Sequence, residues 1–278
     1  MAMEWNCSFG QTVVLLDTDT GEFKQAVTDS DSHFLAWAPD GQSLYLKVNT
    51  VTHPQVLRLH LNGDREPLPI TEMTYDLAPD SNGAGFIYSF SRGMGFGSEM
   101  DLAGPDGGNV RRIITDAQYY VSFARWSPDG KQVAYIKTPD SQTPFTVGEL
   151  WVMSADGSNS RKLADADSGH GFAPAWSPNG AQLAFVARDN PRDAAADQSS
   201  SALVSNIHLV NVESDIEKPL TKFKLTNVGK PVWSPDGNQL AITLVMNDKM
   251  NVVLVDAASG AARQVLAEST CCAAWIRK

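Results

Sequence analysis

The residues of this 278-residue sequence that could act as metal ligands or nucleophiles do not fall into active-site spacings. No nucleophile elbow, phosphate-binding loop, Cys-x-x-Cys pair or His-Glu-x-x-His motif occurs. Asp17 begins a segment like a calcium loop, but Gly21 replaces a ligand and Thr28 stands where the closing Glu belongs. The histidines show no zinc-binding spacing: His33, His53, His60, His170 and His208. The sequence therefore predicts no catalytic residue, no metal ligand and no cofactor.

Aromatic and charged side chains gather instead in segments that are predicted to be loops. Three long segments, at residues 91–97, 139–147 and 189–202, carry Arg92, Phe96 and Phe145. A second group of loops is predicted to carry six further candidate ligand-binding residues: His33, Tyr119, Tyr120, His170, Phe172 and Lys230. Rigid scaffolds carry function on their loops, so these residues are the candidate binding surface for a peptide or small ligand.

The elements that must position these loops come from a repeat. Trp-Ser-Pro-Asp-Gly at residues 126–130 is followed by an apolar strand, and close copies stand at residues 37–41, 176–180 and 233–237. A degraded copy occupies residues 77–83, and Trp275 begins another. Each repeat reads as four short strands, named A to D from the Trp, joined by tight turns. In the turn, Pro fixes φ, Asp accepts from nearby amides and Gly takes a positive φ.

Four-stranded repeats of this length are the blades of a β-propeller. We expect one all-β domain over residues 1–278 with six antiparallel blades. The approximate blade ranges are 31–71, 74–115, 119–165, 170–222, 227–266, and 270–278 combined with 1–28. The last blade is a three-plus-one closure, in which residues 270–277 supply strand A and the N-terminus supplies strands B, C and D.

The repeat resembles that of the TolB-like six-bladed β-propellers, which are related to WD-repeat-like propellers and whose blade signature is Trp-Ser-Pro-Asp-Gly followed by an apolar strand. The resemblance covers nearly all of the chain and is specific for the blade rather than for a function. The chain lacks the separate N-terminal domain of the envelope protein TolB and the hydrolase domain of related peptidases. The resemblance implies an extracytoplasmic setting, periplasmic or cell-envelope, whereas no signal peptide is visible in the sequence, which leaves a cytoplasmic setting open.

Strand alternation divides the loops between two faces. The A–B and C–D turns lie on one face, and the B–C and D–A loops lie on the other with the mouth of the central channel. Because the three long segments are B–C loops and the second group are D–A loops, all the candidate binding residues are predicted on this second face. The signature turns are predicted to be scaffold, with the Trp packing between blades.

Two pairings are predicted from the blade alignment. Asp76 and Arg125 occupy the position before the Trp in neighbouring blades, where four other blades have apolar residues, so we expect a partly buried salt bridge. In the closing blade, Cys7 is aligned with Cys271 and Cys272, which predicts a disulfide to one of them in an oxidising compartment. Separately solvated charges and free thiols are the alternatives.

Charge and hydropathy exclude some partners. The net charge of −10 has the wrong sign for binding a phosphate backbone, and no apolar run reaches the length of a membrane helix. We therefore expect a monomeric, non-enzymatic scaffold that binds a protein or peptide, without nucleic acid or membrane insertion. The alternatives are a hydrolase- or lactonase-type enzyme with a cation or metal-dependent site in the channel, and an accessory propeller of a larger peptidase or sensor.

Overall fold

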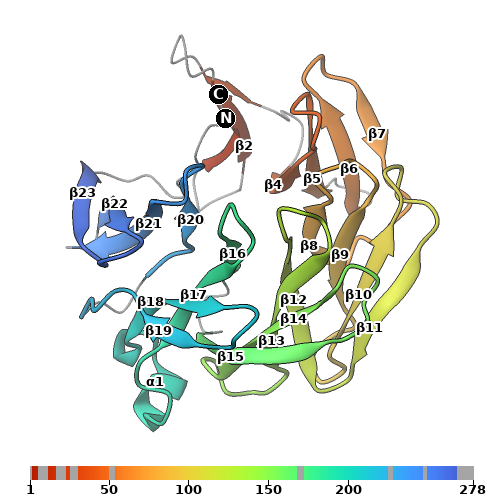
Figure 1. The fold of residues 1–278 in the computed structure, drawn as a ribbon. Coiled ribbons are helices and arrows are strands. Elements are labelled where there is room, and N and C mark those ends of the chain that lie inside the picture. Colours follow the sequence, from red (N-terminus) through yellow and green to blue (C-terminus); the bar gives the residue numbers. More distant parts are fainter. Residues whose placement is uncertain are drawn as a thin grey trace. The chain divides into compact units, whose positions relative to one another are not determined.

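The computed structural model describes residues 2–5, 12–16, 23–25, 31–49, 54–167, 172–224, 228–246 and 249–267. These residues form mainly β-strands (Figure 1), together with the short helix α1 (Ala194–Gln198) and the 3-10 turn η1 (Ser200–Ala202). In this part of the chain, no helix has the length and apolar composition needed to cross a membrane.

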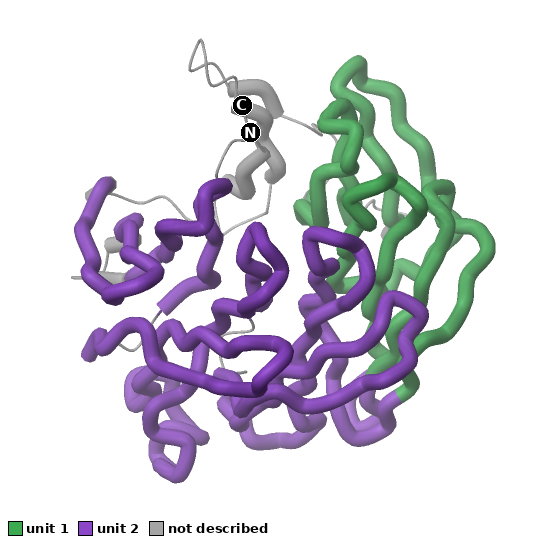
Figure 2. Tube along the Cα trace, viewed as in Figure 1, with its two compact units in different colours: residues 1–92, 98–115 green, residues 93–97, 116–278 purple. Residues whose placement is uncertain are grey.

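The chain divides into two compact units (Figure 2). Unit 1 contains residues 1–92 and 98–115, and unit 2 contains residues 93–97 and 116–278. The segment 93–97 therefore belongs with unit 2 although it interrupts unit 1 in the sequence. Whether the two units form one domain, as the repeat predicts, stays a prediction.

Unit 1 is built on two four-stranded antiparallel sheets and one three-stranded sheet. The first sheet contains β4 (Asp31–Trp37), β5 (Ser43–Asn49), β6 (Pro54–His60) and β7 (Arg65–Pro67). The second contains β8 (Thr74–Pro79), β9 (Phe86–Ser91), β10 (Ser98–Ala103) and β11 (Arg111–Asp116). The three-stranded sheet contains β1 (Ala2–Trp5), β2 (Thr12–Leu16) and β3 (Phe23–Gln25). Tyr45, Phe86 and Tyr88 are buried neighbours in the core of the four-stranded sheets.

Unit 2 contains three four-stranded antiparallel sheets. The first has β12 (Tyr119–Trp126), β13 (Gln132–Pro139), β14 (Val147–Ser154) and β15 (Arg161–Asp167). The second has β16 (Ala175–Trp176), β17 (Gln182–Arg188), β18 (Ser205–Asn211) and β19 (Glu217–Pro219). The third has β20 (Val232–Trp233), β21 (Gln239–Met246), β22 (Lys249–Asp256) and β23 (Ala262–Ala267).

The described strands confirm blades of four antiparallel strands, but they give five such blades rather than the predicted six. The N-terminal segments form a three-stranded sheet, and residues 270–277, from which a fourth strand was predicted, lie outside the described residues. Cys7, Cys271 and Cys272 lie outside them as well. The three-plus-one closure and the disulfide stay predictions.

The signature turn is held by its own side chains. In the turn after β12, Ser127 Oγ donates to Asp129 Oδ1 at 2.7 Å and accepts from the backbone N–H of Gln132 at 2.9 Å. Asp129 Oδ1 also accepts from the N–H of Lys131 at 3.1 Å, and Gly130 has φ of 70°. The same contacts recur in the turn after β20. The predicted roles of Asp and Gly in the turn are thus confirmed.

The signature tryptophans join successive blades within unit 2. Trp176 Nε1 donates to the carbonyl oxygen of Arg125 at 2.8 Å, and Trp233 Nε1 donates to the carbonyl oxygen of Ala175 at 3.0 Å. In both cases the acceptor is the residue before the signature Trp of the preceding blade. Trp176 and Trp233 are buried in the apolar clusters between these blades, so the predicted packing role is confirmed for both.

We expect Trp176→Phe and Trp233→Phe each to lower the free energy of unfolding by about 1–2 kcal/mol, because each leaves a partly buried carbonyl without its donor. Urea unfolding of each variant measures the change. The two substitutions remove equivalent bonds, so similar losses are expected, and wild-type stability in both would contradict the assigned role.

We expect the signature serine to control the ionisation of its neighbour. Hydrogen bonds from the Ser234 hydroxyl and the Asn238 amide hold the pKa of Asp236 below its usual value. A carboxyl with a lowered folded-state pKa stabilises the fold above its unfolded pKa and loses that contribution as the pH falls through the folded pKa. Ser234→Ala should therefore raise the pKa of Asp236 and reduce this acid-sensitive contribution, as measured by NMR titration of the carboxyl carbon.

Asp256 is the internal control for this titration, because Ser259 rather than Ser234 lowers its pKa. An unchanged Asp236 titration in Ser234→Ala would show that the hydroxyl contact does not act in solution.

Candidate functional site

The candidate site is a set of three loops in unit 2, which we call the linked loops: residues 93–97, 140–146 and 189–204. The second and third connect strands B and C of their blades, and the first is the part of the β9–β10 connection that belongs to unit 2. Because adjacent strands are antiparallel, B–C loops emerge at the blade end opposite the signature turns. Specific hydrogen bonds join the three loops in series.

The first linked loop alternates glycine with large apolar residues. Gly93, Gly95 and Gly97 have φ of 101°, 80° and 68°, values that favour glycine. At Gly97 any Cβ would lie 1.9 Å from the carbonyl oxygen of Asp116, so no other residue fits there without a shift. The alternation leaves Met94 and Phe96 as the displayed side chains, 80% and 62% exposed.

Both ends of this loop are fastened to the neighbouring blade. The Tyr120 hydroxyl donates to the carbonyl oxygen of Gly93 at 3.4 Å, and the N–H of Gly97 donates to Asp140 Oδ2 at 2.9 Å. Asp140 begins the second linked loop, and its own N–H donates to the carbonyl oxygen of Gln118 at 2.8 Å. The predicted ligand residue Tyr120 therefore supports the loop that carries Phe96.

A buried arginine joins the second and third linked loops. Arg188, at the end of β17, has a side chain only 1% exposed, and it donates to the carbonyl oxygens of Phe145 at 2.8 Å and Asp193 at 3.0 Å. Its guanidinium also pairs with Asp197 of α1 at 2.8 Å. The N–H of Phe145 donates to the carbonyl oxygen of Asp197 at 3.2 Å, so the two loops are held directly as well.

The remaining predicted ligand residues are dispersed. Phe172 packs against the apolar cluster between the second and third blades of unit 2, and Lys230 is exposed. Tyr119 lies beside Lys137, whose Nζ is 5.6 Å from the ring centroid. His33 and Arg92 belong to unit 1, where Arg92 Nε lies 3.7 Å from Glu99 Oε1. His170 lies outside the described residues.

The predicted salt bridge between Asp76 and Arg125 stays a prediction. Asp76 is buried in β8 of unit 1, whereas Arg125 lies in β12 of unit 2, where its Nη1 donates to the carbonyl oxygen of Ala124 at 2.5 Å.

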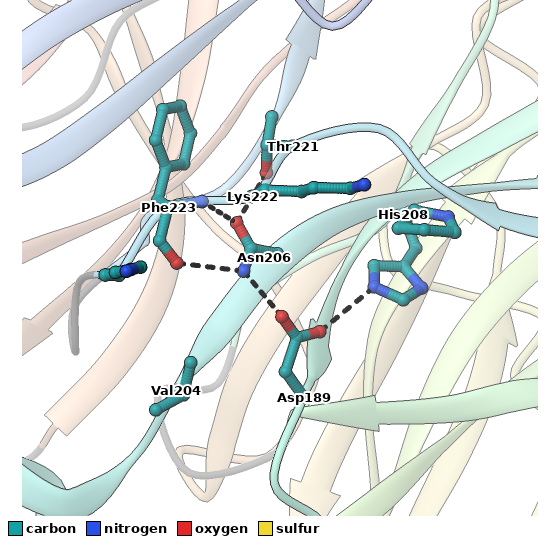
Figure 3. A pocket seen from close by; sticks show the side chains of 9 residues that line it. Asp189, Val204, Asn206, His208, Thr221, Lys222 and Phe223 are labelled. Atoms are coloured by element: carbon teal, nitrogen blue, oxygen red, sulfur yellow. Dashed lines mark hydrogen bonds and ion pairs between the residues drawn. The ribbon is translucent and has the colours of Figure 1, made fainter.

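A pocket that the sequence did not indicate lies where the third linked loop meets the edge of its blade (Figure 3). It has a volume of about 420 Å³ and lies between the loop ends, β18 and the segment after β19. Its polar centre is the carboxylate of Asp189, flanked by Asn206 and His208. The one signal available was that Asn206 and His208 alternate with the apolar residues Ile207 and Leu209 in β18.

Metal-ligating side chains do not gather elsewhere in the described part of the chain. No group of three or more histidine, cysteine, aspartate or glutamate side chains is arranged there to hold a metal ion.

Comparison with known proteins identifies the architecture. No protein-family model matches the chain, and no curated protein sequence matches it. Among solved structures, TolB from Acinetobacter baumannii is 18% identical with a TM-score of 0.67, over 96% of this chain and 63% of that one. The fold is that of a β-propeller.

Two other propellers show how varied the similar structures are. A putative TolB from Agrobacterium tumefaciens is 20% identical with a TM-score of 0.65, over 96% of this chain and 90% of that one. An oligogalacturonate lyase in complex with manganese is 15% identical with a TM-score of 0.66, over 96% of this chain and 73% of that one. Similar propellers thus include an enzyme, and identities this low show the fold alone.

We expect Arg188→Met to separate the second and third linked loops, because methionine keeps the buried length but makes none of the three polar contacts. Protection of the Phe145 and Ser199 amides from hydrogen exchange should fall about 10- to 100-fold, equivalent to about 1–3 kcal/mol in local opening. Arg192→Met, an exposed change in the same loop, is the matched control. Equal protection in both variants would contradict the role of Arg188.

Proposed function

We propose that the chain is a non-enzymatic binding module that docks a protein or peptide partner through the linked loops. The observation that carries this proposal is the exposure of Met94 and Phe96 on a loop whose two ends are hydrogen-bonded to the next blade. Exposed aromatic and methionine side chains are typical of interface anchors. A loop that is already ordered loses less conformational entropy on binding than a free one.

The partner proposed is a protein with an apolar cavity rather than a nucleic acid. The net charge of −10 opposes binding to a phosphate backbone, whereas two exposed apolar side chains on one short loop suit insertion into a partner's cavity. The similar TolB structures support a binding propeller. We further propose a monomer in an extracytoplasmic setting, which rests on the family resemblance of the blade repeat.

We expect Phe96 to lie in the interface. A photo-crosslinking benzoylphenylalanine at position 96, in the full chain expressed in its native cells, should capture a partner that mass spectrometry then identifies. With that partner purified, Phe96→Ser should weaken binding about 10- to 30-fold, the loss typical of a central anchor.

The matched controls place the same probe and the same substitution at Lys131, an exposed residue of a signature turn on the opposite face. Equal affinity of the identified partner for wild type and for the double variant Met94→Ser/Phe96→Ser would reject the linked loops as the docking surface.

A further inference from the structure

We propose that the pocket at the β18–β19 edge binds a small zwitterion, specifically a free α-amino acid with an apolar side chain. The ammonium group would bind Asp189, the carboxylate would bind Lys222 and Lys224, and the side chain would lie against apolar residues. This site is distinct from the linked-loop anchors, Met94 and Phe96, and does not depend on them.

The first support is that Asp189 is a fixed carboxylate with unused acceptor capacity. Its Oδ2 accepts from Asn206 Nδ2 at 2.7 Å, and its Oδ1 lies 3.3 Å from His208 Nε2. A carboxylate has about four acceptor sites, so each oxygen can accept one more hydrogen bond. The side chain of Asp189 is 39% exposed, so these sites are open to a ligand. An ammonium group, with three donors and a positive charge, matches them.

The second support is that Asn206 holds the pocket in shape. Its side chain is buried, and its Oδ1 accepts from Thr221 Oγ1 at 2.8 Å and from the N–H of Phe223 at 2.6 Å. Its Nδ2 donates to Asp189 and to the carbonyl oxygen of Phe223. All four hydrogen-bonding positions of the amide are therefore used. One side chain thus positions both the carboxylate and the opposite wall, the supporting arrangement that a binding site requires (Figure 3).

The third support is the charge on the rest of the lining. Lys222 and Lys224 both line the pocket and are exposed, and neither has an ion-pair partner among the residues with described side chains. His208 is already engaged, since its Nδ1 lies 2.7 Å from Glu217 Oε1. The residues that line the pocket therefore carry one acceptor carboxylate and two ammonium groups without an ion-pair partner among the described side chains.

These opposite charges decide the ligand class. A simple anion would satisfy the lysines but leave Asp189 without a cation, and a simple cation would satisfy Asp189 but leave the lysines without an anion. A ligand that carries both charges satisfies both. The volume of about 420 Å³ is near the lower end of ligand pockets, roughly 300–1,000 Å³, and Val204, Pro219 and Phe223 supply apolar lining. A small amino acid with an apolar side chain fits this lining better than a long polar one.

The test is isothermal titration calorimetry of the full chain with three probes: L-leucine, L-leucinamide, which lacks the carboxylate, and N-acetyl-L-leucine, which lacks the ammonium group. We expect saturable binding of L-leucine and at least about tenfold weaker binding of each of the other two. Asp189→Asn should weaken L-leucine and L-leucinamide by about tenfold without weakening N-acetyl-L-leucine. Lys222→Gln/Lys224→Gln should weaken L-leucine and N-acetyl-L-leucine but not L-leucinamide.

Lys218→Gln is the matched control, because Lys218 is exposed in β19 but does not line the pocket. Thermal unfolding shows whether each variant is folded. If Asp189→Asn does not fold, the lysine variants still test the proposal. The proposal is overturned if none of the probes binds saturably at millimolar concentration, or if the pocket variants bind L-leucine as Lys218→Gln does. Crosslinking through Phe96 is unaffected by either result, so the partner-binding proposal stands or fails separately.

Discussion

The hydrogen bonds from the indoles of Trp176 and Trp233 to the preceding blade are the contacts on which the rest of unit 2 depends. Trp176 and Trp233 reach across an otherwise apolar interface to the backbone beside the preceding signature Trp. Apolar packing alone has little directional preference, whereas this bond fixes how far one blade is displaced along the next. Gly180 and Gly237 support the same alignment of neighbouring blades, because each packs against the signature proline of the preceding blade.

The signature turns and the candidate binding residues occupy opposite ends of the blades, and this division explains their different sequences. At the signature end, the Ser and Asp side chains bind within the turn, and the Trp donates to the preceding blade. At the other end, the linked loops differ from one another in length and composition, and a few long-range contacts hold them. Arg188 provides three such contacts from one buried guanidinium, which allows α1 and the segment near Phe145 to be ordered without a shared strand.

Sequence predicted the blades well because their determinants are local. The Pro-Asp-Gly turn and the alternation of strand residues act over a few positions, so the repeat alone indicated blades of four strands. The pocket could not be, because Asp189, Asn206 and Phe223 meet only after three separate segments pack together. The likeness between blades also suggested a sixth complete one, whereas the described N-terminal segments form a three-stranded sheet. Tyr120 was predicted near the binding face, but its support of Gly93 required knowing which loop lay beside it.

In the first linked loop, the alternating glycines make the backbone path independent of which residues stand at positions 94 and 96. The path is set by the conformations of Gly93, Gly95 and Gly97 and by contacts made through backbone atoms. Residues 94 and 96 can then be exchanged without rebuilding the loop, since the hydrogen bonds that hold its ends do not involve their side chains. The side chains displayed at these two positions can therefore change by substitution at two codons, with the backbone scaffold inherited intact.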